Sequence, residues 1–432
     1  MVDVLGYGDV GGPWGGGATL GAATPNIDAL SSGGLALTST YSQPTCTPTR
    51  SAMMTGRLPV RTGLIRPILA GDVIARNPWE DEKSVAAILS DAGYHTILTG
   101  KWHTGDARRY PDLVLNEDRL ARFQDVTGRI DMYYGQKGQG EKVVVRTKSV
   151  EQFAEADQIL ADFTVSKIKK LAKGDKPFFI SHNFMRVHAD NHPSKTYRGA
   201  SASKYPFKDN VVEVDAHVGA MIEALDEAGV LENTFIFFTS DNGPQLDAWP
   251  DSGHTPFRSG KGTAWEGAVR VPGIAYWKGM IAPRESAELF DLLDLFNTTV
   301  HLAGADDRIP DDRYIDGIDQ TSFLIVDEGQ SKREHVYIWL GEQLMAVRMY
   351  EYKLHLQVMH QESAFQAIDF ATRSHVGLSP WLFNLYIDPK EQMPVGHRMN
   401  PWLASIGGEA KMHGATFRKF PPKDIGLSTE AK

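Results

Sequence analysis

Thr-Phe-Ile-Phe-Phe-Thr-Ser-Asp-Asn-Gly, residues 234–243, is the stretch that decides the fold class. Its apolar part, Phe235 to Thr239, shows no alternation of polar and apolar residues, so it predicts a strand buried on both faces. Phe178 to Ile180 repeats this pattern earlier in the chain. Strands of this kind are typical of sheets covered by helices, and a central, mostly parallel sheet is the simplest account.

The segments around this stretch alternate between strand type and helix type. In chain order they are Ile97 to Gly100, Ser149 to Leu171, Pro177 to Phe184, Asn210 to Ala228 and Thr234 to Ser240. Short apolar runs predict strands, and longer stretches with apolar residues three or four apart predict helices. This alternation predicts an α/β fold.

The pattern changes near Val336, where short apolar runs begin to follow one another without long helices between them. These runs are Val336 to Leu340, Leu344 to Tyr350, Lys353 to Val358 and Leu382 to Ile387. Short strands separated by turns are typical of an antiparallel sheet. We therefore expect a small antiparallel sheet in the C-terminal part of the chain.

Composition narrows the classes of function. The chain has 432 residues, which allows about two or three domains. Hydrophobic residues make up 42% and charged residues 23%, as in ordinary globular proteins. The formal net charge of -9 argues against a nucleic-acid partner, so an anionic ligand would need a locally basic pocket. No stretch approaches about 18 uninterrupted apolar residues, so no membrane span is expected.

Cys46 is the one cysteine of the sequence, which excludes a disulfide framework and zinc sites built on cysteine pairs. It opens the segment Cys46-Thr-Pro-Thr-Arg50, where we expect a helix to start. Residues four apart lie on one face of a helix, and the N-terminal end of a helix carries partial positive charge. Cys46 and Arg50 therefore predict an anion site that contains a nucleophile.

Two more polar groups follow predicted strands, where the site of an open α/β sheet is built. Lys101 and His103 stand two residues apart after the strand that ends at Thr99, so both side chains can face one ligand. Asp241 and Asn242 directly follow the strand at 235–238. Carboxylate and amide oxygens side by side are typical ligands of hard cations, so this pair predicts a metal site.

Together these motifs resemble the type I sulfatases, which are formylglycine-dependent, arylsulfatase-like members of the alkaline phosphatase superfamily. The resemblance spans nearly the whole chain and rests on C-x-P-x-R at 46–50 followed by Thr-Gly-Arg at 55–57, Gly-Lys-Trp-His at 100–103, Asp-Asn-Gly at 241–243, and G-K-G-x-x-W-E-G-x-x-R-V-P at 260–272. In the last element, Glu266 and Arg270 lie four apart and are expected to form a structural ion pair.

The resemblance implies an oxidised cysteine and a bound cation. A formylglycine-generating maturation enzyme would convert Cys46 to 3-oxoalanine (Cα-formylglycine), and Ca²⁺, or Mg²⁺ as an alternative, would lie beside it. The implied metal ligands are Asp3, Asp241, Asn242 and the modified Cys46. The implied catalytic residues are Cys46, Arg50, Lys101, His103, His188 and Lys261. His188 matches the family's active-site histidine, although Val187 and Asp190 stand where the family has prolines.

The N-terminus departs from the family pattern. Family members usually begin with a buried strand that ends in two aspartates, whereas Asp3 is followed here by Val4. An apolar side chain cannot coordinate Ca²⁺, so we expect reduced metal affinity. Met1 starts within that first strand, so most of the strand, and any signal peptide, is missing from the sequence as given. The compartment stays open; a periplasmic or secreted location would fit a truncated N-terminus.

The resemblance implies an alkaline-phosphatase-like α/β fold, with a large mixed sheet flanked by helices over residues 1–330 and a smaller C-terminal subdomain with an antiparallel sheet over 331–432. The implied activity is hydrolysis of sulfate monoesters, either aryl sulfates or sulfated carbohydrates. Two alternatives remain: a phosphate or phosphonate monoester hydrolase of the same superfamily, and a catalytically impaired descendant that binds anions. The sequence names neither the ester nor the oligomeric state.

Overall fold

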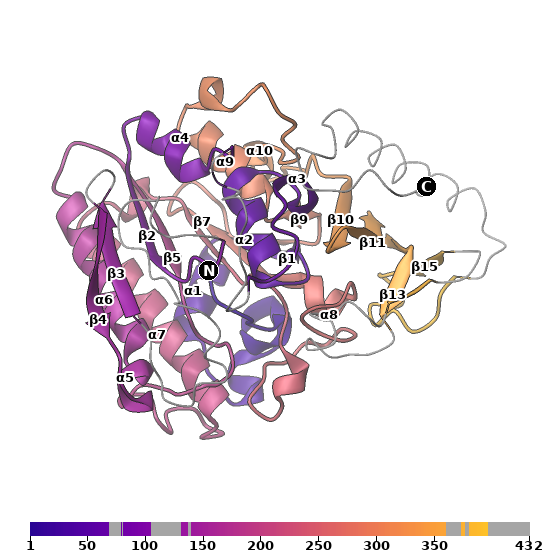
Figure 1. Ribbon diagram of the computed structural model, residues 1–432, viewed down its shortest axis with the longest axis horizontal. Coiled ribbons are helices and arrows are strands. Elements are labelled where there is room, and N and C mark those ends of the chain that lie inside the picture. The colour runs from indigo at the N-terminus through magenta and orange to yellow at the C-terminus, as the bar shows by residue number, and fades with distance from the viewer. Residues whose placement is uncertain are drawn as a thin grey trace.

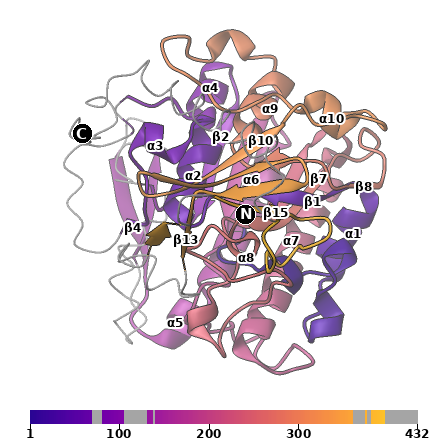
Figure 2. The same cartoon turned by 90° about the vertical axis from the view of Figure 1, so that its right-hand side faces the viewer.

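The computed structural model describes residues 1–68, 79, 81–104, 131–136, 140–359, 373–375 and 380–395. Figure 1 shows a main body in which strands lie between helices, with the C-terminal strands, coloured orange to yellow, beside it. Figure 2 turns the molecule so that these C-terminal strands face the viewer. The predicted α/β fold with a C-terminal antiparallel sheet is confirmed.

The central sheet is mixed. Its strands are β1 (Leu35–Tyr41), β6 (Ile236–Thr239), β7 (Arg270–Tyr276), β8 (Arg284–Ser286) and β9 (Phe290–Asp291), and a separate parallel pair consists of β2 (His95–Gly100) and β5 (Phe178–Asn183). β7 runs antiparallel to both β1 and β6, whereas β8 and β9 run parallel to β1. β1, β6, β8 and β9 thus share one direction and only β7 opposes them, so the sheet is mostly parallel, as predicted, with β7 as the strand that makes it mixed. An apolar pattern on both faces indicates that helices cover a strand, but it does not indicate the direction of the neighbouring strand, so β7 could not be predicted.

Helices cover both faces of these strands. One face holds α1 (Pro25–Gly33), α6 (Ala156–Leu171) and α7 (Pro206–Glu227), and the other holds α2 (Cys46–Thr55), α4 (Val85–Asp91) and α9 (Asp294–Leu302). The helix predicted over 149–171 is divided into α5 (Val150–Ala154) and α6, with Glu155 between them. Helix α7 begins with proline at its first position, where the missing N–H costs no hydrogen bond.

The remaining elements are short. They are α3 (Pro59–Thr62), α8 (Glu266–Val269) and α10 (Thr321–Ile325), the hairpin of β3 (Asp131–Gln136) and β4 (Gly140–Arg146), and 3₁₀ turns at Tyr7–Asp9, Gly12–Trp14, Gly17–Leu20, Leu231–Asn233, Leu246–Ala248 and Asp306–Arg308. None of the helices among the described residues combines the length and the apolar character needed to cross a membrane.

The C-terminal sheet has the strand order β10-β11-β12-β15, and all its pairs are antiparallel. Its strands are β10 (His335–Leu340), β11 (Gln343–Met349), β12 (Tyr352–His355) and β15 (Trp381–Asn384), and β13 (Gln357–Met359) pairs with β14 (Arg373–His375) beside it. Val336, Ile338 and Met345 of this sheet pack with Tyr41 and Ala268 of the main body in one buried cluster. This shared core fixes the C-terminal sheet against β1 and α8.

Residues 1–3 lie between the carboxyl ends of β5 and β6 and join them by backbone hydrogen bonds. Phe184 N–H donates to the Met1 oxygen at 2.9 Å, and Val2 N–H donates to the Thr239 oxygen at 2.9 Å. Among the described residues β5 and β6 are not paired with each other, and both line a largely apolar cavity of about 730 Å³. Asp3 is thus held by both strands at the edge of the sheet where a site is expected.

Candidate active site

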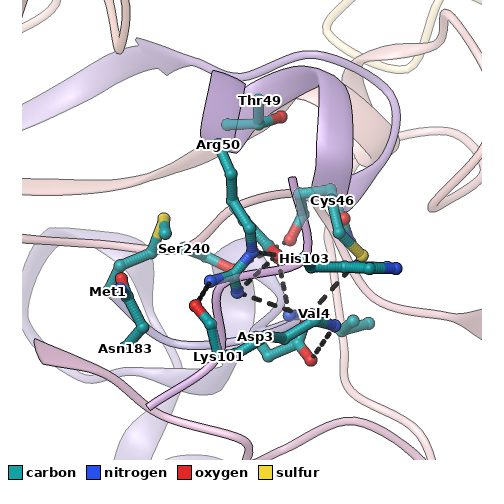
Figure 3. Close-up of polar contacts among 12 residues, drawn as sticks. Met1, Asp3, Val4, Cys46, Thr49, Arg50, Lys101, His103, Asn183 and Ser240 are labelled. Atoms are coloured by element: carbon teal, nitrogen blue, oxygen red, sulfur yellow. Dashed lines mark hydrogen bonds and ion pairs between the residues drawn. The ribbon is translucent and has the colours of Figure 1, made fainter. Parts of the chain in front are cut away.

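Helix α2 places Cys46 and Arg50 at the carboxyl edge of the strands. The helix begins at Cys46, as predicted, and ends before Gly56, whose φ of 66° is the left-handed conformation that glycine adopts readily at a helix end. Both side chains are buried, with exposed fractions of 1% and 2%. In Figure 3, Arg50 extends from α2 toward Lys101 and Asp3.

Asp3, Arg50, Lys101 and Asp241 form a buried group of two carboxylates and two cations, here called the active-site cluster. Lys101 Nζ lies 2.6 Å from Asp3 Oδ2. Arg50 NH2 lies 2.8 Å from Asp241 Oδ2, and Arg50 NH1 donates to the backbone oxygen of Lys101 at 2.9 Å. The cluster therefore joins residue 3, α2, the end of β2 and the end of β6 at one point.

The cluster changes the acid strength of its members. Burial alone would raise the pKa of Asp3, but Lys101 and Arg50 outweigh it and lower that pKa. Burial, with a contribution from Asp241, raises the pKa of the Cys46 thiol to about 11. Cys46 as a thiol is therefore protonated at neutral pH, and a protonated thiol is a poor nucleophile.

Three of the four residues expected to hold a metal lie together. Ligand atoms of Asp3, Cys46 and Asp241 all fall within 4.8 Å of one another. Among the described residues, the buried Oδ1 of Asn242 has no hydrogen-bond partner, while its Nδ2 donates to the Gly243 oxygen at 2.9 Å. The two carboxylates and the unpartnered amide oxygen of Asn242, the residue after Asp241, are the donor types that hard cations prefer, so these residues fit Ca²⁺.

Val4 stands at the edge of this donor set and adds no ligand to it. Its N–H donates to Asp241 Oδ1 at 3.0 Å, and its apolar side chain is 2% exposed. Its φ is 62°, a left-handed conformation that is unfavourable for a β-branched residue. The position where the family pattern has its second N-terminal aspartate is therefore filled by an apolar group on a strained backbone.

His103 is held as a neutral base. Its Nε2 lies 2.9 Å from the backbone oxygen of Ile68, and because a carbonyl oxygen only accepts, Nε2 carries the proton. Among the described residues the buried Nδ1 has no partner, so its lone pair is free to accept a proton. Burial and the charge of Lys101 lower the pKa of His103 well below its usual range. Thr47 Oγ1 donates to the backbone oxygen of His103 at 2.6 Å and fixes that segment to α2.

Lys261 and His188 form a second pair. Lys261 Nζ lies 2.9 Å from His188 Nε2, and His188 Nδ1 donates to the Ala189 oxygen at 2.7 Å. His188 is thus neutral and accepts from Lys261, in agreement with a pKa lowered well below its usual range by burial and by the Lys261 charge. The charge of Lys261 also acts on both Asp3 and Cys46, which places this pair beside the active-site cluster.

Gln245 and Thr47 contact Lys261 and His103, and neither residue was predicted from the sequence. Gln245 Oε1 accepts from Lys261 Nζ at 3.2 Å, so it helps to aim the ammonium group. It follows Asn242 by three residues on the same loop, and reading past Asp-Asn-Gly along that loop would have found it. Thr47 lies inside the C-x-P-x-R motif, at a position that the motif leaves open.

Family models match most of the chain. The model described as "Sulfatase" matches residues 10–305, and the model described as "C-terminal region of aryl-sulfatase" matches residues 331–425. The chain belongs to the sulfatase family. As a sulfatase it hydrolyses sulfate esters, and it shares the alkaline-phosphatase-like fold of arylsulfatase-like proteins.

Individual sulfatases are similar along nearly the whole length. N-acetylgalactosamine-6-sulfatase of Canis lupus familiaris is 32% identical over 93% of this chain and 82% of its own length. Arylsulfatase A of Homo sapiens is 31% identical over 90% of this chain and 81% of its own length. The crystal structure of the PsFucS1 sulfatase from Pseudoalteromonas sp. is 43% identical, covers 98% of this chain and 90% of that chain, and gives a TM-score of 0.90.

Proposed function

We propose that this sulfatase hydrolyses sulfate esters of carbohydrates with a nucleophile made from Cys46. The observation that carries the proposal is the position of Cys46, buried at the start of α2 with Asp3 and Asp241 in reach. Its thiol, with a pKa of about 11, is unsuited to the reaction as it stands. Oxidation to Cα-formylglycine would replace the sulfur by an aldehyde, whose hydrate offers a hydroxyl nucleophile and a second hydroxyl that can regenerate the aldehyde.

Asp3, Asp241, Asn242 and the modified Cys46 would hold Ca²⁺, for which the unpartnered Oδ1 of Asn242 is a suitable donor. A bound divalent cation supplies positive charge that lowers the pKa of a neighbouring hydroxyl. Mg²⁺ is the alternative ion, and the choice between the two depends on the number of oxygens that the site provides.

Lys261 is assigned the first proton transfer. As the S–O bond to the sugar breaks, the leaving oxygen gains negative charge and needs a proton. Lys261 is cationic and is aimed by His188 and Gln245, so it donates this proton and stabilises the departing charge. Arg50 and Lys101 provide further fixed positive charge around the transferred sulfuryl group.

His103 is assigned the second proton transfer. Its Nδ1 carries a lone pair because Nε2 holds the proton donated to Ile68. In the first step one hydroxyl of the hydrated residue 46 attacks sulfur, and its proton replaces the one that Lys261 gives to the leaving oxygen, so residue 46 carries the sulfate as an ester. In the second step the C–O bond to this sulfate breaks, His103 Nδ1 accepts the proton of the remaining hydroxyl, and the aldehyde forms again. Alcohol release and sulfate release are thus served by different side chains.

The substrate class rests on similarity. The N-acetylgalactosamine-6-sulfatase of Canis lupus familiaris acts, by its name, on a sulfated sugar and aligns with 93% of this chain. A carbohydrate sulfate is a monoanion, and the three cations Arg50, Lys101 and Lys261 outnumber the two carboxylates of the active-site cluster by one. The site therefore supplies the locally basic pocket that the acidic chain needs for an anionic ligand.

Two measurements test this proposal: the chemical state of Cys46 and the preference for sulfate over phosphate esters. The protein is produced together with a formylglycine-generating enzyme, and mass spectrometry of the peptide around Cys46 reports whether the thiol has been replaced. Sulfated monosaccharides and the matched phosphate esters are then compared by kcat/KM. We expect conversion of Cys46, a preference for sulfate esters, and loss of turnover in Cys46→Ala.

Ser51→Ala, on the same helix, is the matched control and should keep its activity. An intact thiol, under conditions that mature a reference sulfatase, would contradict the proposed nucleophile. A higher kcat/KM on the phosphate ester would favour the phosphate monoester hydrolase instead.

A further inference from the structure

A second group of buried polar side chains lies where the C-terminal sheet meets the main body. We refer to it as the C-terminal cluster, and its members are Tyr41, Glu266, Arg348, Lys353, His355 and Glu391. Glu266 Oε1 accepts from Lys353 Nζ at 2.9 Å, and Glu266 Oε2 accepts from the Tyr41 hydroxyl at 2.7 Å. The expected pair of Glu266 and Arg270 is present at 3.6 Å but is only one part of this larger arrangement.

Glu391 holds the most connected position in the C-terminal cluster. Its Oε1 accepts from His355 Nε2 at 2.6 Å and lies 3.1 Å from Lys353 Nζ. Its Oε2 accepts from the backbone N–H of Glu266 at 2.7 Å. Its backbone oxygen accepts from Arg258 NH1 at 3.0 Å. The side chain is fully buried, so these contacts are shielded from water.

Arg258 and Glu266 are the two ends of the segment that carries Lys261. The N–H of Gly267 donates to the backbone oxygen of Arg258 at 2.9 Å and closes the segment into a loop. A Cβ at Gly267 would clash with that same oxygen, so the closure needs glycine. Glu391 contacts both ends of this closed loop.

The tip of the loop is fixed against the loops of the active site. Lys261 N–H donates to the Pro244 oxygen at 2.9 Å, and Gly262 N–H donates to the Pro44 oxygen at 2.7 Å. Pro44 precedes α2, and Pro244 follows Asn242 and Gly243. The loop therefore spans from the C-terminal cluster at its base to the Lys261 ammonium at its tip.

The Glu391 side chain is a charged carboxylate at neutral pH. Burial alone would raise the pKa of Glu391, but Lys353 and His355 outweigh it and lower that pKa to about 2. Arg258 also lies over the Trp265 ring at 3.8 Å, and Trp265 contacts His355 with ring centroids 4.4 Å apart. Charge and ring contacts together leave the base of the loop little freedom to shift.

We propose that Glu391 is a positioning residue for Lys261: by holding both ends of the loop 258–266, it sets where the Lys261 ammonium meets His188 and the leaving oxygen. The inference rests on the function proposed above, because it acts through the role of Lys261. The C-terminal part of the chain then contributes to the reaction without touching the substrate.

The first experiment measures the mature enzyme on aryl sulfates whose leaving groups differ in pKa. Glu391→Ala removes the acceptor of the Glu266 N–H, whereas Glu391→Gln keeps an acceptor oxygen and loses the charge. A displacement of a catalytic group by about 1 Å can lower the reaction rate about 10²-fold. We expect Glu391→Ala to lose about 10- to 100-fold in kcat on poor leaving groups, with less loss on good ones, and Glu391→Gln to lie between it and the wild type.

The second experiment is a double-mutant cycle. In a Lys261→Ala background, Glu391→Ala should reduce kcat little further, because the group that it positions is already gone. Asp294→Asn is the matched control, since Asp294 is the buried carboxylate that pairs with Arg333 away from the loop. Any loss of kcat in Asp294→Asn should be the same for good and poor leaving groups. Additive losses in the cycle, or a leaving-group profile like that of the control, would overturn the proposal.

Hydrogen exchange keeps the two proposals separable. In Glu391→Gln, amides of 258–267 should exchange faster than in the wild type, while those of α2 stay unchanged. Unchanged exchange at 258–267 would overturn the positioning role even if Glu391→Ala fails to fold. A wild-type enzyme that cleaves no sulfate ester would instead overturn the proposed function, and the exchange result would still decide whether Glu391 holds the loop.

Discussion

The segment 258–267 joins two buried clusters of charge that differ in how their carboxylate and amide oxygens are used. Lys261 acts on the active-site cluster, and Glu266 belongs to the C-terminal cluster. In the C-terminal cluster all four carboxylate oxygens of Glu266 and Glu391 accept hydrogen bonds. Beside the active-site cluster, Asn242 Oδ1 and His103 Nδ1 have no partner among the described residues. Within the described part of the chain, the C-terminal cluster has two nitrogens without a hydrogen-bond partner, His355 Nδ1 and Arg348 NH1, but no unpartnered carboxylate oxygen, so the contrast lies in the oxygens.

This difference separates a structural cluster from a reactive one. Leaving a buried polar atom unpaired costs about 1–3 kcal/mol, so such atoms are rare where only stability matters. The unpaired atoms beside the active-site cluster are suited to a metal ion and to a transferred proton. The filled carboxylates of the C-terminal cluster are suited to holding the 258–267 segment and the C-terminal sheet together.

The largest expected effects come from removing one lysine from each cluster. Lys353→Met leaves Glu266 and Glu391 buried without their shared cation, and breaking a buried pair costs about 3–5 kcal/mol. Lys101→Met should instead lower kcat by about 10²- to 10³-fold, with a smaller loss of stability because Arg50 remains beside Asp3. Denaturant unfolding and steady-state kinetics on both variants measure the contrast.

Each lysine variant serves as the control for the other. If Lys353→Met keeps its stability, the C-terminal cluster is not structural. If Lys101→Met loses stability as strongly as Lys353→Met does, the active-site cluster is as structural as the C-terminal cluster.

His103→Ala tests the reactive cluster at its free nitrogen. Removing this base should leave alcohol release largely intact and slow sulfate release, so one equivalent of aryl alcohol should appear in a burst, followed by a steady state about 10²- to 10⁴-fold slower. Rapid mixing with an activated aryl sulfate measures both phases. His182→Asn, at another buried histidine whose pKa burial lowers, should show no burst.

The pH profile gives a second check on His103. The residue acts as a base only when it is neutral, and its lowered pKa keeps it neutral below pH 6.5. The rate of sulfate release should therefore fall on the acid side only at a pH below the ordinary histidine value. An acid limb at or above pH 6.5 would contradict the assignment.

The sequence predicted local features well and long-range ones poorly. The start of α2 at Cys46 and the strand before Asp241 were predictable because apolar patterns and motifs are local. The direction of β7 was not, because burial on both faces does not depend on the direction of the neighbouring strand. Glu391 was missed because it contacts Glu266 from 125 residues away, and no local pattern marks such a pair.

Val4→Asp tests the smallest and most local difference, the missing oxygen beside Asp3 and Asp241. Aspartate tolerates the φ of 62° better than valine does, and its carboxylate adds a hard ligand. We expect Ca²⁺ affinity to rise about tenfold, which is about 1.4 kcal/mol. Val4→Asn relieves the same backbone strain and adds a neutral oxygen, so it should fall between valine and aspartate. Calorimetric titration with Ca²⁺ ranks the three proteins.

Without metal, Val4→Asp should be less stable than the wild type, because a third buried carboxylate then lacks a cation. Equal affinities across the series would mean that another donor already completes the site.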